Sequence, residues 1–246
     1  MDRLIYTAMS GMSDSMLRQR VLASNMSNSQ TIGFRAEMLY STPVTLKGPG
    51  IEARAMSEGE VHGADMTAGS IAQTGRPLDI ALAGDALLTV QAEDGSEAYS
   101  RRGDLSISVT GVLQNGDGRP VVGSSGPITL PPGAQASTSP DGAVLLANPE
   151  APDQPPQTID KLKLVSPKGS KVAKDMDGLF RVVGGGVLPA DENARVQSGA
   201  LEQSNVQPSE VIVQMIQAQR LFDIRTKLIS TARDVDESGA ALMRIS

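Results

Sequence analysis

Apolar residues recur every three or four positions near the C-terminal end of the chain, in two neighbouring stripes. The first stripe holds Val211, Met215, Ala218, Phe222, Ile229 and Ala232, and the second holds Leu221, Ile224, Leu228, Val235 and Leu242. Pro208 and Ser209 suit the first turn of a helix, and Glu210 places negative charge near the positive end of the helix dipole. The pattern therefore predicts a long amphipathic helix that begins near Pro208.

The N-terminal end has a matching pattern, which predicts a helix over residues 3 to about 28. Its apolar positions are Ile5, Met9, Met12, Met16, Ala23 and Met26, with Leu4, Ala8 and Leu22 beside them. The segment contains many Ser and Asn residues and Gly11, so we expect neither terminal helix to be firm alone. We predict that the two helices pair with each other, or with neighbouring subunits, in a coiled-coil-like layer.

Between the helices, short segments of β-type composition alternate with turn dipeptides such as Asn115-Gly116 and Asp141-Gly142. The predicted strands lie at 79–83, 87–91, 105–109, 120–122, 128–130, 144–146, 162–165 and 179–183. The proline-rich stretch 147–156 predicts an exposed loop, and residues 35 to about 73 predict an extended connector with at most a short hairpin.

The expected fold class is α+β, with long N- and C-terminal helices around an antiparallel β-rich body domain. The organisation has four parts. We predict an N-terminal assembly helix at 1–34, a connector at 35–75, the body at 76–197 and a C-terminal assembly helix at 198–246, which pairs with the first.

Composition narrows the function classes for these 246 residues. Aromatic residues make up 2% and there is no Trp, which suits modest domains and helical seams better than a large enzyme core. The chain has no Cys, which excludes disulfides and thiolate sites, and its net charge of -6 argues against nucleic-acid binding. Asp14, Arg18 and Arg20 interrupt any signal-peptide core, so the residues alone favour a cytoplasmic protein.

Candidate chemistry is sparse. His62, the only histidine, lies near Glu58 and Glu60, but a zinc site needs three or four ligands, so we interpret it as a solvated loop histidine. Residues 115–118 resemble a calcium loop only faintly and predict a hairpin turn, and Gly184 to Gly186 also predict a turn. No hydrolase motif is present, and we expect no catalytic residue, cofactor, metal or small-molecule substrate.

The methionines of the N-terminal helix have two interpretations. Met at helical spacing forms either an adaptable recognition groove or a packing seam. The two interpretations merge where such a seam must adjust to several neighbouring subunits.

Three separated segments resemble the flagellar axial proteins of rod, hook and hook junction. Ile5 to Arg35 is similar to their N-terminal signature, with matches at Ala8, Gly11, Asn25, Asn28, Thr31, Gly33 and Phe34. Ser198 to Val206, with Met215 to Arg220, is similar to their C-terminal signature. The segments 74–85 and 99–105 resemble the start of the body domain, although Ala86-Leu87-Leu88 stands where the family usually has aromatic residues.

The resemblance implies a structural subunit of the bacterial flagellar basal-body rod, which self-assembles into a helical tube and transmits motor torque. The opening residues of the chain, Met1 to Tyr6, and its short length resemble subunits of the proximal rod more than those of the distal rod. The implied assembly interface comprises Ile5, Met9, Met12, Met16, Asn25, Asn28, Gly33, Phe34, Met215, Ala218, Leu221, Phe222, Ile224, Leu228, Ile229 and Val235.

The implied partners are other copies of the chain, other rod proteins and the flagellar type III export apparatus. The implied location is the rod in the periplasm, reached without a cleaved signal. Two alternatives are another axial protein, of the distal rod or hook, and, from a different class, a soluble binding module or enzyme with a coiled-coil dimerisation stalk.

Overall fold

The computed structural model describes residues 2–45, 55–131, 135–147, 155–175 and 177–243. These residues form two compact units. The first unit combines the ranges 1–27, 37–63 and 207–246, and the second combines 28–36 and 64–206.

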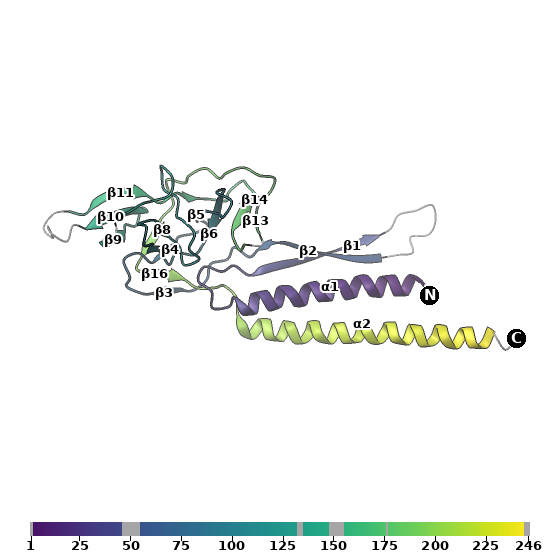
Figure 1. Ribbon diagram of the computed structural model, residues 1–246. Helices are drawn as coiled ribbons and strands as arrows, with labels where there is room; N and C mark the ends of the chain where they lie inside the picture. The colour runs from purple at the N-terminus through teal and green to yellow at the C-terminus, as the bar shows by residue number, and fades with distance from the viewer. Residues whose placement is uncertain (1, 46–54, 132–134, 148–154, 176, 244–246) are drawn as a thin grey trace. The chain divides into compact units, whose positions relative to one another are not determined.

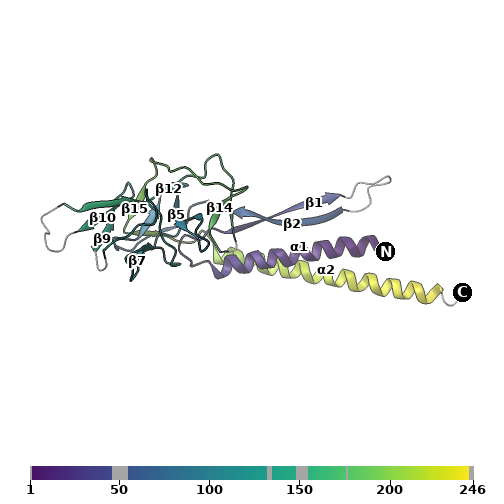
Figure 2. The same ribbon diagram turned by 45° about the horizontal axis from the view of Figure 1, so that its top comes forward.

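Two long helices, α1 (Asp2–Ser27) and α2 (Pro208–Met243), dominate the first unit. They lie side by side and run in opposite directions (Figures 1 and 2). The first turn of α2 carries Glu210, and the backbone N–H of Val211 donates to Gln207 O at 3.1 Å. Both helices predicted from periodicity are confirmed, α1 within about two residues of the expected 3–28 and α2 from the expected Pro208. The C-terminal helical part expected from residue 198 is too long, because residues 200–202 form a strand.

The first unit also contains a two-stranded sheet of β1 (Glu37–Thr45) and β2 (Ala55–Ala64). The extended connector expected here contains the hairpin that the sequence left open, but its strands, of nine and ten residues, are much longer than the short hairpin expected. Pro43 and the mixed Ser, Thr and Gly positions hide the apolar alternation that marks a strand in sequence. Packing of β1 against α1 supplies the support that an isolated hairpin lacks.

The second unit is a set of small antiparallel sheets. The largest has the strand order β12-β5-β6-β14-β13, a second has the order β11-β10-β9, and three pairs are β15-β4, β16-β3 and β7-β8. The strands are β3 (Ile71–Gln73), β4 (Ile80–Leu82), β5 (Leu87–Gln91), β6 (Glu97–Ser100), β7 (Ser106–Ile107), β8 (Leu113–Gln114), β9 (Gln135–Thr138), β10 (Ala143–Ala147), β11 (Gln157–Lys161), β12 (Leu164–Val165), β13 (Val172–Lys174), β14 (Phe180–Val182), β15 (Val196–Ser198) and β16 (Ala200–Glu202).

Five of the predicted strands are confirmed at β4, β5, β10, β12 and β14. The predicted segments 120–122 and 128–130 form only isolated bridges, and 105–109 shortens to β7. Strands β9 and β11 escape prediction because their sequences, QAST and QTIDK, are short and largely polar. Residues 148–154 of the predicted proline-rich loop lie outside the described residues.

The core of the second unit consists mainly of aliphatic side chains, as composition predicts. One cluster contains Leu88, Val90 and Leu113, all fully buried. A smaller cluster joins Leu87 to the aromatic residues Tyr99 and Phe180. The segment Ala86-Leu87-Leu88 is therefore buried without the aromatic residues usual in the family.

Candidate functional site

The described side chains of α2 divide into two faces. Six of them are buried or half-buried, and we name this set the inner stripe: Val211, Ala218, Phe222, Arg225, Ile229 and Ala232. The second apolar stripe of the sequence is exposed, and we name its described members the outer stripe: Leu221, Ile224, Leu228 and Val235. Of the predicted interface residues on α2, Met215 is also exposed.

The methionines of α1 lie largely outside the buried face of that helix. Met9 and Met16 are 56% and 59% exposed, and Met12 is half-buried. The buried positions of α1 include small or polar residues that the apolar pattern did not select, Gly11, Asp14 and Ser15. The side chain of Ile5 lies outside the described residues. Sequence periodicity located the helix but not the face that packs.

Polar contacts join the two helices. The guanidinium Nη1 of Arg225 donates to the backbone carbonyl of Gly11 and to Ser15 Oγ. Further along, Gln19 Nε2 donates to Gln219 Oε1 at 3.2 Å. The seam of the first unit therefore combines apolar packing with a specific cationic contact that periodicity cannot reveal, because Arg225 interrupts the apolar stripe.

Asn25, a predicted interface residue, is buried within the first unit. Its Nδ2 donates to Glu37 O at 3.0 Å, and its Oδ1 accepts from Glu37 N at 2.8 Å. Both halves of the side-chain amide therefore pair with the start of β1. This contact holds the strand on the helix and leaves Asn25 only 6% exposed.

In the second unit, the remaining predicted residues of the N-terminal signature form a tight turn. Asn28 Oδ1 accepts from Thr31 Oγ1 at 3.1 Å. Gly33 has a φ of 67°, and a Cβ there would lie 2.4 Å from Arg101 O. Only glycine suits this position. Phe34 is buried, with Lys174 Nζ 3.6 Å from its ring centroid, so cation–π attraction adds to its packing.

The buried carboxylate of Glu202 connects three parts of the second unit. It pairs with Arg35 Nη2 at 2.7 Å, accepts from Arg101 Nε at 2.9 Å and also accepts from Arg101 Nη2. The backbone N–H of Gly69 donates to it at 2.9 Å. These contacts tie the end of the N-terminal signature, the middle segment and the C-terminal signature together.

Arg101 has further acceptors besides Glu202. Its guanidinium donates to the carbonyls of Leu82, Gly84 and Ala86 at 2.6–3.0 Å. Burial lowers the pKa of Arg101 from its ordinary value, and the charge of Glu202 opposes that effect. The arginine therefore braces the turn between β4 and β5 while it neutralises a buried carboxylate.

Asn205 bridges separate backbone segments of the second unit. Its Oδ1 accepts from Ala36 N at 2.8 Å, and its Nδ2 donates to Asp65 O and Thr67 O at 2.9 and 3.0 Å. Sequence reasoning missed the roles of Arg35, Arg101, Glu202 and Asn205. The available signal was the presence of charged and amide residues inside the signature segments.

In the parts of the chain that the structure describes, no arrangement of side chains supports a catalytic site. No group of three or more His, Asp or Glu side chains there could hold a metal ion. His62 lies in β2, so the expected loop position is wrong, and its side chain is outside the described set. Among the described residues, no helix is long and apolar enough to cross a membrane.

The two glycine-rich candidates are turns, as predicted. Asn115 Oδ1 accepts from Asp117 N at 3.1 Å and Arg119 N at 3.0 Å, and Asp117 pairs with Arg102 at 2.6 Å. Gly184, Gly185 and Gly186 all have positive φ. Neither turn presents a free ligand set for a cation or a phosphate.

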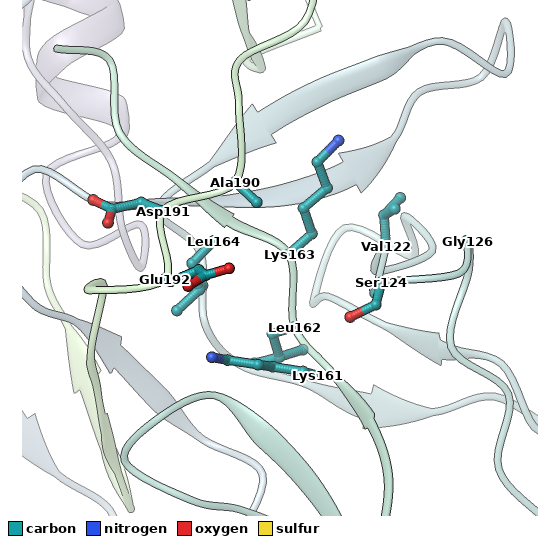
Figure 3. Close-up of a pocket in the computed structure, with 11 residues that line it drawn as sticks. Val122, Ser124, Gly126, Lys161, Leu162, Lys163, Leu164, Ala190, Asp191 and Glu192 are labelled. Carbon is teal, nitrogen blue, oxygen red and sulfur yellow. The ribbon is translucent and has the colours of Figure 1, made fainter.

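A pocket of about 490 Å³ lies in the second unit (Figure 3). Its lining includes Lys161, Lys163 and Glu192, and the two lysine side chains point away from each other. Glu97 holds Lys163 Nζ at 2.7 and 2.9 Å, so that cation is already neutralised. The described lining residues include no hydrogen-bonded pair of nucleophile and base.

Comparison with known proteins gives a consistent result. Residues 5–35 match the family "Flagella basal body rod protein", 81–146 match "Flagellar hook protein FlgE/F/G D1 domain" and 197–242 match "Flagellar basal body rod FlgEFG protein C-terminal". The chain is 39% identical to the flagellar basal-body rod protein FlgF of Salmonella typhimurium over 252 residues, which covers 100% of each chain. The chain belongs to the flagellar basal-body rod proteins.

The chain is also similar to two other rod proteins. FlgF of Escherichia coli is 40% identical over 240 residues and 95% of each chain, whereas FlgG of Bacillus subtilis is 28% identical over 256 residues, 95% of this chain and 96% of its own. This rod protein is therefore FlgF-like. Rod proteins are structural, which agrees with the expectation that the chain is not an enzyme.

Proposed function

We propose that the chain is a subunit of the proximal rod, which assembles with copies of itself and with other rod proteins into a helical tube that transmits motor torque. The outer stripe carries this proposal. Four large apolar side chains follow one line of α2, and Ile224 is 62% exposed. A row of this kind on one chain is typical of a surface that a partner covers.

In this proposal the terminal helices form a coiled-coil-like layer, and the β-rich unit sets register with neighbouring subunits. The contact between subunits is head-to-tail and does not close, so it propagates as a helix. Full burial of a Leu or Ile side chain contributes about 1.5–3 kcal/mol, so the outer stripe alone supplies several kcal/mol per contact. Met9 and Met16 add adaptable apolar surface on α1.

The proposal extends to the place of assembly. We expect the chain to pass through the flagellar type III export apparatus without a cleaved signal and to join the rod in the periplasm. The absence of cysteine is compatible with passage into an oxidising compartment, since no thiol can mispair.

The variant Leu228→Asp tests the proposal. Leu228 is 44% exposed, so the substitution should leave both units of the single chain folded. Where a partner covers that position, it would bury an unpaired charge, at a cost of several kcal/mol per contact. We expect normal synthesis, unchanged far-ultraviolet circular dichroism, truncated basal bodies and loss of motility.

The control is Ser230→Asp, which adds the same charge at an exposed polar position of α2. It should swim normally. Motility of Leu228→Asp at the level of the control would show that the outer stripe is not an assembly surface. Loss of strand content in purified Leu228→Asp would show that this residue belongs to the folded core of the chain.

A further inference from the structure

The inner and outer stripes compete for the same place against α1. At 3.6 residues per turn they lie roughly 100° apart around α2. Both are rich in apolar side chains, so hydrophobic burial alone does not select which stripe faces α1. A rotation of α2 about its axis would bury the outer stripe within the chain and remove it from the surface.

Arg225 distinguishes the two stripes. It is the only charged residue among the six side chains of the inner stripe, and it is half-buried. Its guanidinium contacts the backbone carbonyl of Gly11 and Ser15 Oγ. An exposed arginine would make no such contact, so this pair of acceptors exists only when the inner stripe faces α1.

Gly11 provides the space for the guanidinium. It is buried, and a Cβ built on it would lie 3.1 Å from both Arg225 Cζ and Arg225 Nε. It is also the only glycine in α1. Apart from proline, glycine is the least favourable residue in a helix interior, so its place opposite Arg225 is consistent with a requirement for close approach.

We propose that Arg225, seated on Gly11, fixes the rotation of α2 about its own axis so that the outer stripe remains on the surface. A single polar residue within an apolar seam selects one packing arrangement among several in other helix pairs. This inference rests on the proposed function, in which the outer stripe must stay exposed, because an outer stripe buried within the chain could not bind a neighbouring subunit. Arg225 is thus a positioning residue for assembly.

Disulfide trapping tests the rotation, because the chain has no native cysteine. Gln19→Cys with Gln219→Cys reports the observed rotation, since these side chains are hydrogen-bonded across the seam. Gln19→Cys with Leu221→Cys reports the rotated state, since Leu221 belongs to the outer stripe. An intramolecular disulfide changes the gel mobility of the monomer. The method also works when the two helices are only loosely ordered.

In the full-length chain with native Arg225, we expect the first cysteine pair to form its disulfide at several times the yield of the second. Arg225→Leu should lower that yield ratio at least threefold. Arg233→Leu, the same change at an exposed position of α2, should leave it unchanged. An unchanged ratio in Arg225→Leu would overturn the proposal.

Gly11→Ala separates rotation from helix strength. Alanine strengthens α1, so a role for Gly11 in helix stability alone predicts a higher yield for the observed pair and an unchanged or higher ratio. The proposal predicts a lower ratio, because the new Cβ crowds the guanidinium. A ratio at or above that of the native chain would contradict it.

The result is independent of the test of the proposed function. Trapping reads contacts within one chain, whereas Leu228→Asp reads assembly in cells. If Leu228→Asp swims but the ratio falls in Arg225→Leu, the rotation stands and the assembly surface lies elsewhere. If the ratio stays constant while Leu228→Asp fails to assemble, the proposed function stands without this device.

Discussion

Glu202→Gln should destabilise the second unit strongly. Glu202 is 3% exposed, and its carboxylate lies against Arg35 and Arg101, which are 1% and 2% exposed. The substitution keeps the shape of the side chain but removes the only charge in direct ionic contact with these two guanidiniums in the described residues. Two buried positive charges then face each other without a counter-ion.

The magnitude follows from the contacts. Removal of one partner of a buried ion pair costs about 3–5 kcal/mol, because the remaining charge stays desolvated. Both arginines share this one carboxylate, so their losses are coupled and do not simply add. We expect the free energy of unfolding to fall by at least about 3 kcal/mol, a large part of the roughly 5–15 kcal/mol typical of a domain.

Urea unfolding of the purified chain, followed by far-ultraviolet circular dichroism, measures this loss. The chain has no Trp, so tryptophan fluorescence cannot serve. Glu192→Gln, at an exposed carboxylate, is the matched control and should change stability by less than about 0.5 kcal/mol. A loss below about 1 kcal/mol in Glu202→Gln would refute the view that this carboxylate holds the three segments together.

Further outcomes are expected for two residues of the second unit and for the terminal helices. Gly33→Ala should lower the free energy of unfolding by about 2 kcal/mol or more, because its Cβ would lie 2.4 Å from Arg101 O at a positive φ. In the control Gly95→Ala the new Cβ would meet only a side-chain atom at 4.0 Å, and the loss should be about 1 kcal/mol. Equal losses in urea titration would contradict this prediction. Tyr99→Phe should cost about 1–2 kcal/mol, because Leu188 N loses its acceptor at 2.6 Å. Burial raises the pKa of the Tyr99 hydroxyl in the folded chain. The stability that depends on its neutral form is therefore complete below the pKa of about 10 in the unfolded chain, and it is lost as pH rises through the pKa in the folded chain. Stability should fall less at alkaline pH in Tyr99→Phe. In the isolated chain, backbone amide hydrogens of α1 and α2 should exchange with solvent faster than those of β5 and β6, because the outer stripe lacks a partner. Slow exchange throughout both helices would contradict this prediction.

Elements with local signals follow directly from the order of the amino acids. Steps of three and four residues defined both terminal helices, and Pro208 with Glu210 located the start of α2 within a turn. Turn dipeptides located Asn115 to Gly118, because the hydrogen bonds of such a turn close within a few residues. The signature segments alone indicate the family.

Which faces and charges meet becomes visible only in the folded chain. Periodicity marks an apolar stripe but not its partner, so it could not show that Arg225 faces α1 while Leu228 remains exposed. Strand pairs such as Leu82 with Val196 join residues far apart in the chain, beyond the reach of local pattern. The pairing of Glu202 with arginines over a hundred residues away likewise depends on which segments fold together, because a charge has no local signal of burial.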